Sequence, residues 1–109
     1  MAKGNDKKVV KQTRELLLST LGNLLESHRE RRFKSSSGTP LSRGTFCQAN
    51  NLNESNVAFI ETGRVVELGF NQLRRYLATT YGRSDVRFTT SARKVYDGLK
   101  ELEKFLKEL

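Results

Sequence analysis

The sequence has little that could support covalent or metal chemistry. It contains one cysteine and one histidine among its 109 residues. One cysteine cannot form an internal disulfide bond, and one cysteine with one histidine cannot supply the ligands of a structural zinc site. The sequence also lacks the spacing of a catalytic triad, a cluster of metal ligands and a glycine-rich phosphate loop. We therefore expect neither enzymatic activity nor a cofactor.

Long apolar runs are also missing. No run approaches the roughly 18 residues needed to cross a bilayer, and the lysine-rich beginning lacks the apolar core and cleavage site of a signal peptide. The low cysteine content fits a reducing compartment. These features predict a soluble cytoplasmic protein without membrane contact, and the length predicts a single domain.

What the sequence has instead is positive charge. Lysine and arginine number 20 against 12 acidic residues, which gives a net charge of +8, and the excess is concentrated in residues 1–34. Such an excess favours a polyanion as partner, because contacts with phosphates release condensed counterions. Charge alone does not distinguish DNA from an anionic membrane surface.

Residues 41–64 carry the most informative pattern. Asn53 precedes an apolar run as a helix N-cap, and Gly63 follows that run where a left-handed residue is needed. Two helical faces sharing one small core would account for the spacing of the apolar residues. These residues are Leu41, Phe46, Cys47, Leu52, Val57 and Ile60. The pattern predicts two short helices around a tight turn.

This stretch resembles the XRE family of lambda repressor- and Cro-type DNA-binding domains. The family register runs without a gap through Leu41, Ser42, Phe46, Cys47, Asn51, Leu52, Val57, Ile60, Glu61 and Gly63. The resemblance extends over about residues 21–82. The chain departs from the family at Asn51, where glycine is usual, at Gly44 inside the first motif helix, and in a longer connection over residues 33–40. Gly44 should weaken its helix by roughly 1 kcal/mol relative to alanine.

The resemblance implies an all-α, lambda repressor-like helix-turn-helix domain with extra helices at both ends. We expect an N-terminal helical extension over residues 1–20, the helix-turn-helix domain over 21–82, and a connector with an amphipathic helix over 83–109. The apolar spacing up to Arg32 fits one long helix or two helices broken near Gly22. The segment 85–90 alternates like a strand and fits a strand, a dimer-edge contact or an extended connector.

In the docking mode of this family, the second motif helix enters the major groove of duplex DNA. The resemblance implies base contacts by Glu54, Ser55, Asn56 and Phe59. It implies phosphate contacts by Ser42, Arg43, Arg64, Arg32 and Lys34. Two of these contacts have an alternative that stays open. The Phe59 ring could instead pack on the surface of its own domain, and residues 34–40 could form a solvated linker instead of lying close to DNA.

The resemblance also places a structural ion pair between Arg29 on the first helix and Glu61 near the end of the second motif helix. A bidentate arginine–carboxylate bond there would fix the relative orientation of the two helices.

The C-terminal segment has the spacing of a coiled-coil seam. Its apolar residues are separated by four, three, four and three positions: Val95, Leu99, Leu102, Leu106 and Leu109. Two heptads are too few for an independent coiled coil. This helix therefore packs on the N-terminal helix of its own chain or pairs with a second subunit.

Together these features predict a sequence-specific, DNA-binding transcriptional regulator that reads the major groove as a homodimer. The alternative is a protein-interaction module, such as a DNA-binding antitoxin that masks a partner protein.

Overall fold

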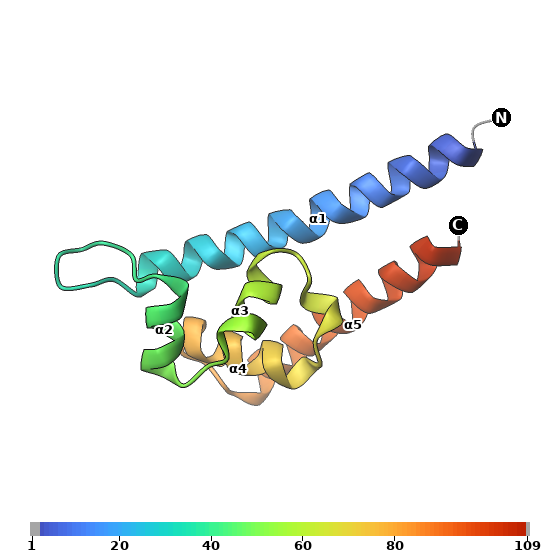
Figure 1. Ribbon diagram of the computed structural model, residues 1–109. Coiled ribbons are helices and arrows are strands. Elements are labelled where there is room, and N and C mark those ends of the chain that lie inside the picture. The colour runs from blue at the N-terminus through green and yellow to red at the C-terminus, as the bar shows by residue number, and fades with distance from the viewer. Residues whose placement is uncertain (1–2, 109) are drawn as a thin grey trace.

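The computed structural model describes the backbone of residues 3–108 and the side chains from Lys8 onward. Within these residues all regular secondary structure is helical, as the sequence predicts (Figure 1). The elements are α1 (Lys3–Arg32), α2 (Arg43–Asn50), α3 (Glu54–Glu61), the 3-10 helix η1 (Val65–Glu67), α4 (Phe70–Tyr81) and α5 (Val86–Glu108). No described helix is both long enough and apolar enough to span a membrane.

The helix α1 is continuous, which decides between the two alternatives left open by its sequence. Gly22 does not break it, because this glycine is the point where α1 meets α3. A Cβ atom at Gly22 would lie only 2.5 Å from the carbonyl oxygen of Glu61. Gly63 approaches α1 from the other side, and its φ of +85° is the left-handed conformation expected from the sequence. The two glycines let the backbones of α1 and α3 come into contact.

The pair α2–α3 has the ends that the sequence predicts. The Ser42 hydroxyl oxygen accepts a hydrogen bond from the Thr45 N–H at 3.2 Å, and Asn53 Oδ1 accepts one from the Asn56 N–H at 3.0 Å. Between the helices, Asn51 has a left-handed backbone with φ 55°. Asparagine tolerates this conformation better than most residues, so the turn forms without glycine.

Around this pair lies one hydrophobic core to which every α helix contributes. Its buried members are Leu18, Leu25, Phe46, Cys47, Val57, Ile60, Val65, Val66, Leu73, Tyr76 and Tyr96. The core therefore spans the predicted domain and also includes one residue of the C-terminal helix.

The prediction of a strand or extended connector over residues 85–90 is wrong, because α5 begins at Val86. Asp85 accepts a hydrogen bond from the Phe88 N–H at 3.1 Å and so caps the first turn of this helix. Val86 is exposed whereas Phe88 is half-buried, so the two side chains do not share a face. The strand-like alternation consists of only Val86 and Phe88, and the helix that Asp85 caps forms in spite of it.

Two parts of the chain project from the core (Figure 1). Residues 33–41 form a hairpin-like loop closed by hydrogen bonds from the Ser35 N–H to the Thr39 carbonyl and from the Leu41 N–H to the Phe33 carbonyl. At the other end, the beginning of α1 and the end of α5 run side by side in opposite directions, joined by an ion pair between Arg14 and Glu103. We call these two helix ends, residues 8–20 and 100–108, the two-helix arm. The molecule measures 58 × 31 × 19 Å.

Candidate nucleic-acid interface

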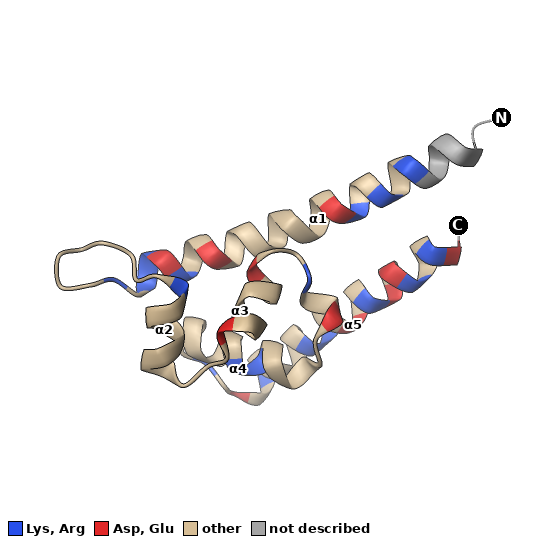
Figure 2. Ribbon diagram, viewed as in Figure 1, with Lys and Arg blue, Asp and Glu red and all other residues tan. Residues whose placement is uncertain are grey.

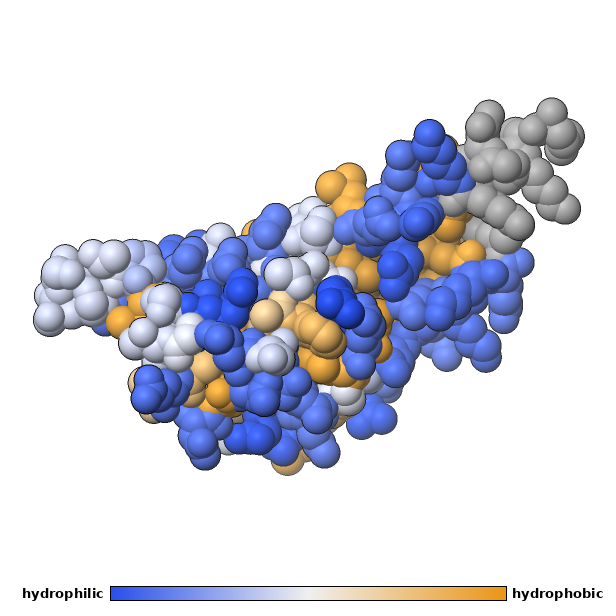
Figure 3. Space-filling model, in the orientation of Figure 1, coloured by the Kyte–Doolittle hydropathy of each residue, from blue (hydrophilic) through white to orange (hydrophobic). Residues whose placement is uncertain are grey.

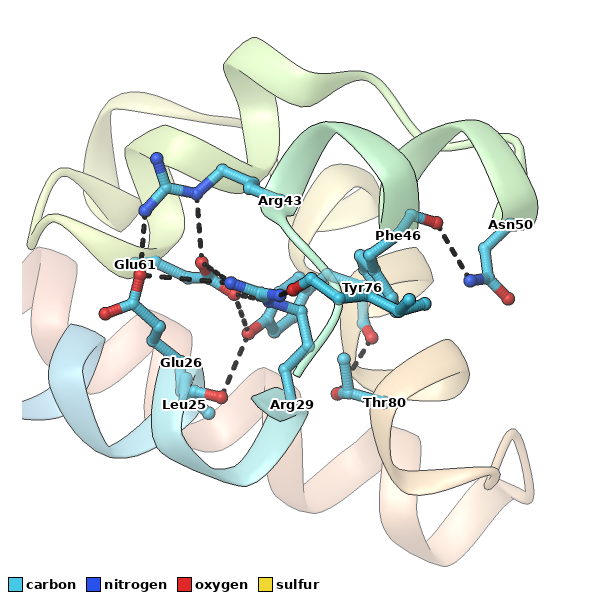
Figure 4. Close-up of polar contacts among 10 residues, drawn as sticks. Leu25, Glu26, Arg29, Arg43, Phe46, Asn50, Glu61, Tyr76 and Thr80 are labelled. Carbon is cyan, nitrogen blue, oxygen red and sulfur yellow. Dashed lines mark hydrogen bonds and ion pairs between the residues drawn. The ribbon is translucent and has the colours of Figure 1, made fainter. Parts of the chain in front are cut away.

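The buried centre of the molecule is the carboxylate of Glu61. Arg29 reaches it from α1 and donates two hydrogen bonds, Nε to Oε2 at 2.7 Å and Nη2 to Oε1 at 3.0 Å (Figure 4). The side chains of Arg29 and Glu61 are only 2% and 0% exposed. The structure thus brings together the two residues of the predicted ion pair in bidentate geometry, which joins α1 to the end of α3.

Two further side chains bind the same carboxylate. The Tyr76 hydroxyl donates from α4 to Glu61 Oε2 at 2.6 Å, and Arg43 Nε donates from the start of α2 to Oε1 at 3.1 Å (Figure 4). Arg43 also donates to Glu26 Oε2 at 2.9 Å. We call Glu26, Arg29, Arg43, Glu61 and Tyr76 the Glu61 network. It connects α1, α2, α3 and α4 at a single point.

The network also determines the protonation states of Glu61 and Tyr76. Burial by itself would raise the pKa of the Glu61 carboxyl, but the hydrogen bonds from Arg29, Tyr76 and Arg43 outweigh burial and hold this pKa below its usual value. Burial and the hydrogen bond to Glu61 raise the pKa of the Tyr76 hydroxyl. At neutral pH the carboxylate is therefore ionised, and the tyrosine remains a donor.

On the opposite side of α3, part of the helix is open to solvent. Glu54 and Ser55 are exposed in its first turn, and Asn56 is half-buried. The Glu54 carboxylate lies against α2, because a Cβ atom at Gly44 would be 2.6 Å from Glu54 Oε2. Gly44 thus makes room for this side chain. Three of the four predicted base-contacting residues are placed in the first turn of one helix.

Phe59 and Arg64 cover one another. The Arg64 guanidinium carbon lies 4.0 Å from the centre of the half-buried Phe59 ring, and the same guanidinium donates twice to the Glu67 carboxylate, each at 2.9 Å. The structure therefore favours the alternative in which Phe59 packs on its own domain. The two groups expected to contact DNA are therefore already engaged: the Phe59 ring by the Arg64 guanidinium, and that guanidinium by the Glu67 carboxylate.

The remaining predicted phosphate contacts gather around the loop of residues 33–41. Arg32 and Lys34 are exposed at its base, and the loop leads directly into Ser42 at the start of α2. Figure 2 shows Lys and Arg residues at this end of α1 and along the two-helix arm, whereas α3 carries none. Positive charge therefore lies on either side of α3 and not on it.

The C-terminal seam packs on its own chain. Leu99, Leu102 and Leu106 are half-buried, but Val95 is 57% exposed, and the buried side chain of the helix is Tyr96. Leu109 lies outside the described residues. Within the chain this helix contacts α1, which is one of the two arrangements that the sequence left open, and its pairing with a second subunit stays a prediction.

Comparison of the chain with models of protein families, with curated proteins and with solved structures found no match. Arguments about its function therefore depend on its own geometry and charge.

Sequence reasoning missed three residues around the site. Tyr76 could have been found, because Leu73, Tyr76 and Thr80 follow each other at helical spacing and are all buried. No local pattern reveals that Glu26 pairs with Arg43. Arg75 of α4 donates to the carbonyl of Asn51 at 3.2 Å and so places a positive charge beside the turn between α2 and α3. Among the described residues, no three potential metal ligands come together.

Proposed function

We propose that this chain is a sequence-specific DNA-binding transcriptional regulator that reads the major groove with α3 and acts as a homodimer. The observation that carries the proposal is the combination of a fixed helix pair with an open first turn. The Glu61 network holds α2 and α3 to the rest of the core, while Glu54 and Ser55 stay exposed. A helix that is held at its C-terminal end and exposed at its N-terminal end suits insertion into a groove.

The charge distribution supports the same proposal. The net charge is +8, and α3 itself carries no cation. A helix in the major groove has phosphates on both of its sides, and phosphate contacts position a protein while base contacts specify the sequence. Arg32 and Lys34 would supply positioning contacts on one side, and Arg64 would do so on the other side once released from Glu67 and the Phe59 ring. The resemblance to lambda repressor-type domains points to this docking mode.

The geometry changes the roles proposed for two residues. Arg43 uses two of its donors on Glu61 and Glu26, so its main contribution is to hold α2. Phe59 would reach a thymine methyl only if Arg64 left its ring. The proposed base readout is therefore centred on Glu54 and Ser55, with Asn56 beside them. A carboxylate can accept from cytosine N4, and a hydroxyl can bond several base edges.

The test is selection of bound duplexes from a random pool, followed by gel shifts at two salt concentrations. Glu54→Gln should change the preferred base at one position and cost about 1 to 3 kcal/mol against the wild-type site. The matched control is Glu101→Gln, because Glu101 is an exposed glutamate on α5, away from α3. It should select the wild-type sequence. Identical selected sequences for both variants, or no selection by the wild type, would contradict the proposal.

A protein-interaction module, such as an antitoxin that masks a partner, is the second candidate. The exposed apolar side chains of α1 favour it, since they include Leu16 at 67% and Leu24 at 64% exposure. If the wild type selects no sequence, this becomes the better proposal.

A further inference from the structure

The outer face of α1 carries apolar side chains that are largely exposed to solvent. Val9, Leu16, Leu17 and Leu24 are between 46% and 67% exposed. At 100° per residue they share one side of the helix with Thr13 and Thr20, which are also exposed. Apolar patches are visible along the two-helix arm in Figure 3. We call these six residues, Val9, Thr13, Leu16, Leu17, Thr20 and Leu24, the α1 stripe.

The stripe contains no charged residue, and one of its polar groups is already satisfied. The Thr13 hydroxyl donates to the carbonyl of Val9 at 2.8 Å, which leaves its methyl group for packing. Burying this face would therefore desolvate no charge. That distinguishes it from the rest of α1, where Arg14 and Arg29 form ion pairs.

The order of residues along the stripe is the same in both directions except at its ends, where Val9 corresponds to Leu24. Read from its centre between Leu16 and Leu17, the stripe has leucine, then threonine, then Val9 on one side and Leu24 on the other. An antiparallel second copy would place Leu16 against Leu17, Thr13 against Thr20 and Val9 against Leu24. A twofold interface needs a surface that is complementary to itself. We propose that the α1 stripe is the dimer interface and that its occupant is the stripe of a second copy, packed antiparallel.

The size of the surface agrees with this occupant. From the exposed fractions of the four apolar side chains and the exposed class of the two threonines, two copies would bury at most roughly 1,000 Å². This area is at the lower limit for a specific interface, so we expect reversible association.

This dimer would also position the two α3 helices, a consequence that rests on the proposed function. Gly22, where α1 contacts α3, lies on the side of α1 opposite to the stripe. Three successive helix spacings of about 9 Å separate the α3 helices across the dimer, and about 16 Å separates the two Gly22 positions along α1. The resulting separation of roughly 30 Å is close to one turn of DNA, the spacing of paired half-sites.

The experiment measures the association of the full chain without DNA by sedimentation equilibrium, so its failure is distinct from a failure of DNA binding. Wild type should be in monomer–dimer equilibrium. Leu17→Lys should raise the dimer dissociation constant by more than about tenfold, because the dimer would bury two lysines near its centre. Gln12→Lys is the matched control: it adds the same charge to an exposed position outside the stripe and should leave the equilibrium unchanged. Circular dichroism checks that both variants keep their helices.

Cysteine pairs test the direction of packing. A mixture of Thr13→Cys and Thr20→Cys chains should form a disulfide-linked heterodimer on oxidation, whereas Thr13→Cys alone should not crosslink. The native Cys47 is 2% exposed and does not compete. A wild type that stays monomeric, a Leu17→Lys variant that dimerises normally, or crosslinking of Thr13→Cys to itself would each overturn the proposal. Dissociation by Val95→Lys but not by Leu17→Lys would assign the interface to α5.

Discussion

The centre of the molecule and its two-helix arm reverse the usual distribution of side chains. At the centre, the charged side chains of Arg29 and Glu61 are 2% and 0% exposed. In the arm, Leu16 is 67% exposed and Phe105 is 56% exposed. The centre can bury its charges because each has a partner, whereas the arm leaves apolar groups in water. The difference indicates that the centre is complete within one chain, whereas the arm has an apolar surface that the proposed dimer would cover.

Replacing the central carboxylate should have the largest effect. Glu61→Gln removes the charge that neutralises Arg29 and should lower the free energy of unfolding by about 3 to 5 kcal/mol, measured by urea denaturation. Glu67→Gln is the matched control, because that carboxylate pairs with Arg64 at the surface and should give no measurable change. Equal losses in the two variants would show that the centre is no more sensitive to charge than the surface.

The stability lost in the Glu61→Gln variant should also depend on pH. The pKa of Glu61 is lower in the folded protein than in the unfolded chain, so its contribution to stability is complete above the unfolded value of about 4.3. The contribution is lost as pH falls toward the folded pKa. The difference in stability between wild type and Glu61→Gln should therefore shrink below about pH 4, and a constant difference would contradict the assignment.

Replacing either of two glycines by alanine should change the stability of the protein, but in opposite directions. Gly22→Ala would place a Cβ atom 2.5 Å from the Glu61 carbonyl oxygen and should destabilise the protein by about 1 to 3 kcal/mol. Gly98→Ala changes a position in the interior of α5 that has open space around it, so it should stabilise the protein by up to about 1 kcal/mol. Thermal denaturation of both variants tests the pair. A stable Gly22→Ala protein would mean that α1 and α3 do not touch as described.

The smallest effect should come from the ion pair of the arm. Arg14→Gln removes the partner of Glu103, but both side chains keep access to solvent, at 30% and 22% exposure. The expected loss is below about 1 kcal/mol in chemical denaturation. A loss as large as that of Glu61→Gln would erase the distinction between arm and centre.

The sequence predicted what depends on neighbouring residues. Ser42 and Asn53 cap their helices and Gly63 ends the second one, because a cap is made within three or four positions of the chain. Asp85 acts by the same rule, but the alternation after it was given more weight than the cap, and the start of α5 was missed. The role of Gly22 inside the continuous helix α1 is its contact with α3, and the residues near Gly22 in the sequence do not reveal that contact.

Predictions for the site were limited by contacts between distant segments. The Arg29–Glu61 pair came from a resemblance to a family, and residues from separate helices meet there. Nothing near Arg43 in the sequence shows that its guanidinium faces Glu26 and Glu61 in place of solvent. Likewise, Phe59 has the spacing of an outward residue, but Arg64 returns over its ring after the turn at Gly63. The partners of long polar side chains depend on the tertiary fold, and helical periodicity in the sequence does not reveal them.

Cys47 gives the molecule a chemical reporter of its own motion. The thiol is 2% exposed, and burial raises its pKa, so little reactive thiolate is present in the folded state. It is also the only cysteine in the sequence. A thiol reagent can therefore modify the chain at one position, and only while the packing of α2 is open. When closing is faster than modification, the labelling rate relative to an unfolded peptide gives the free energy of that opening directly.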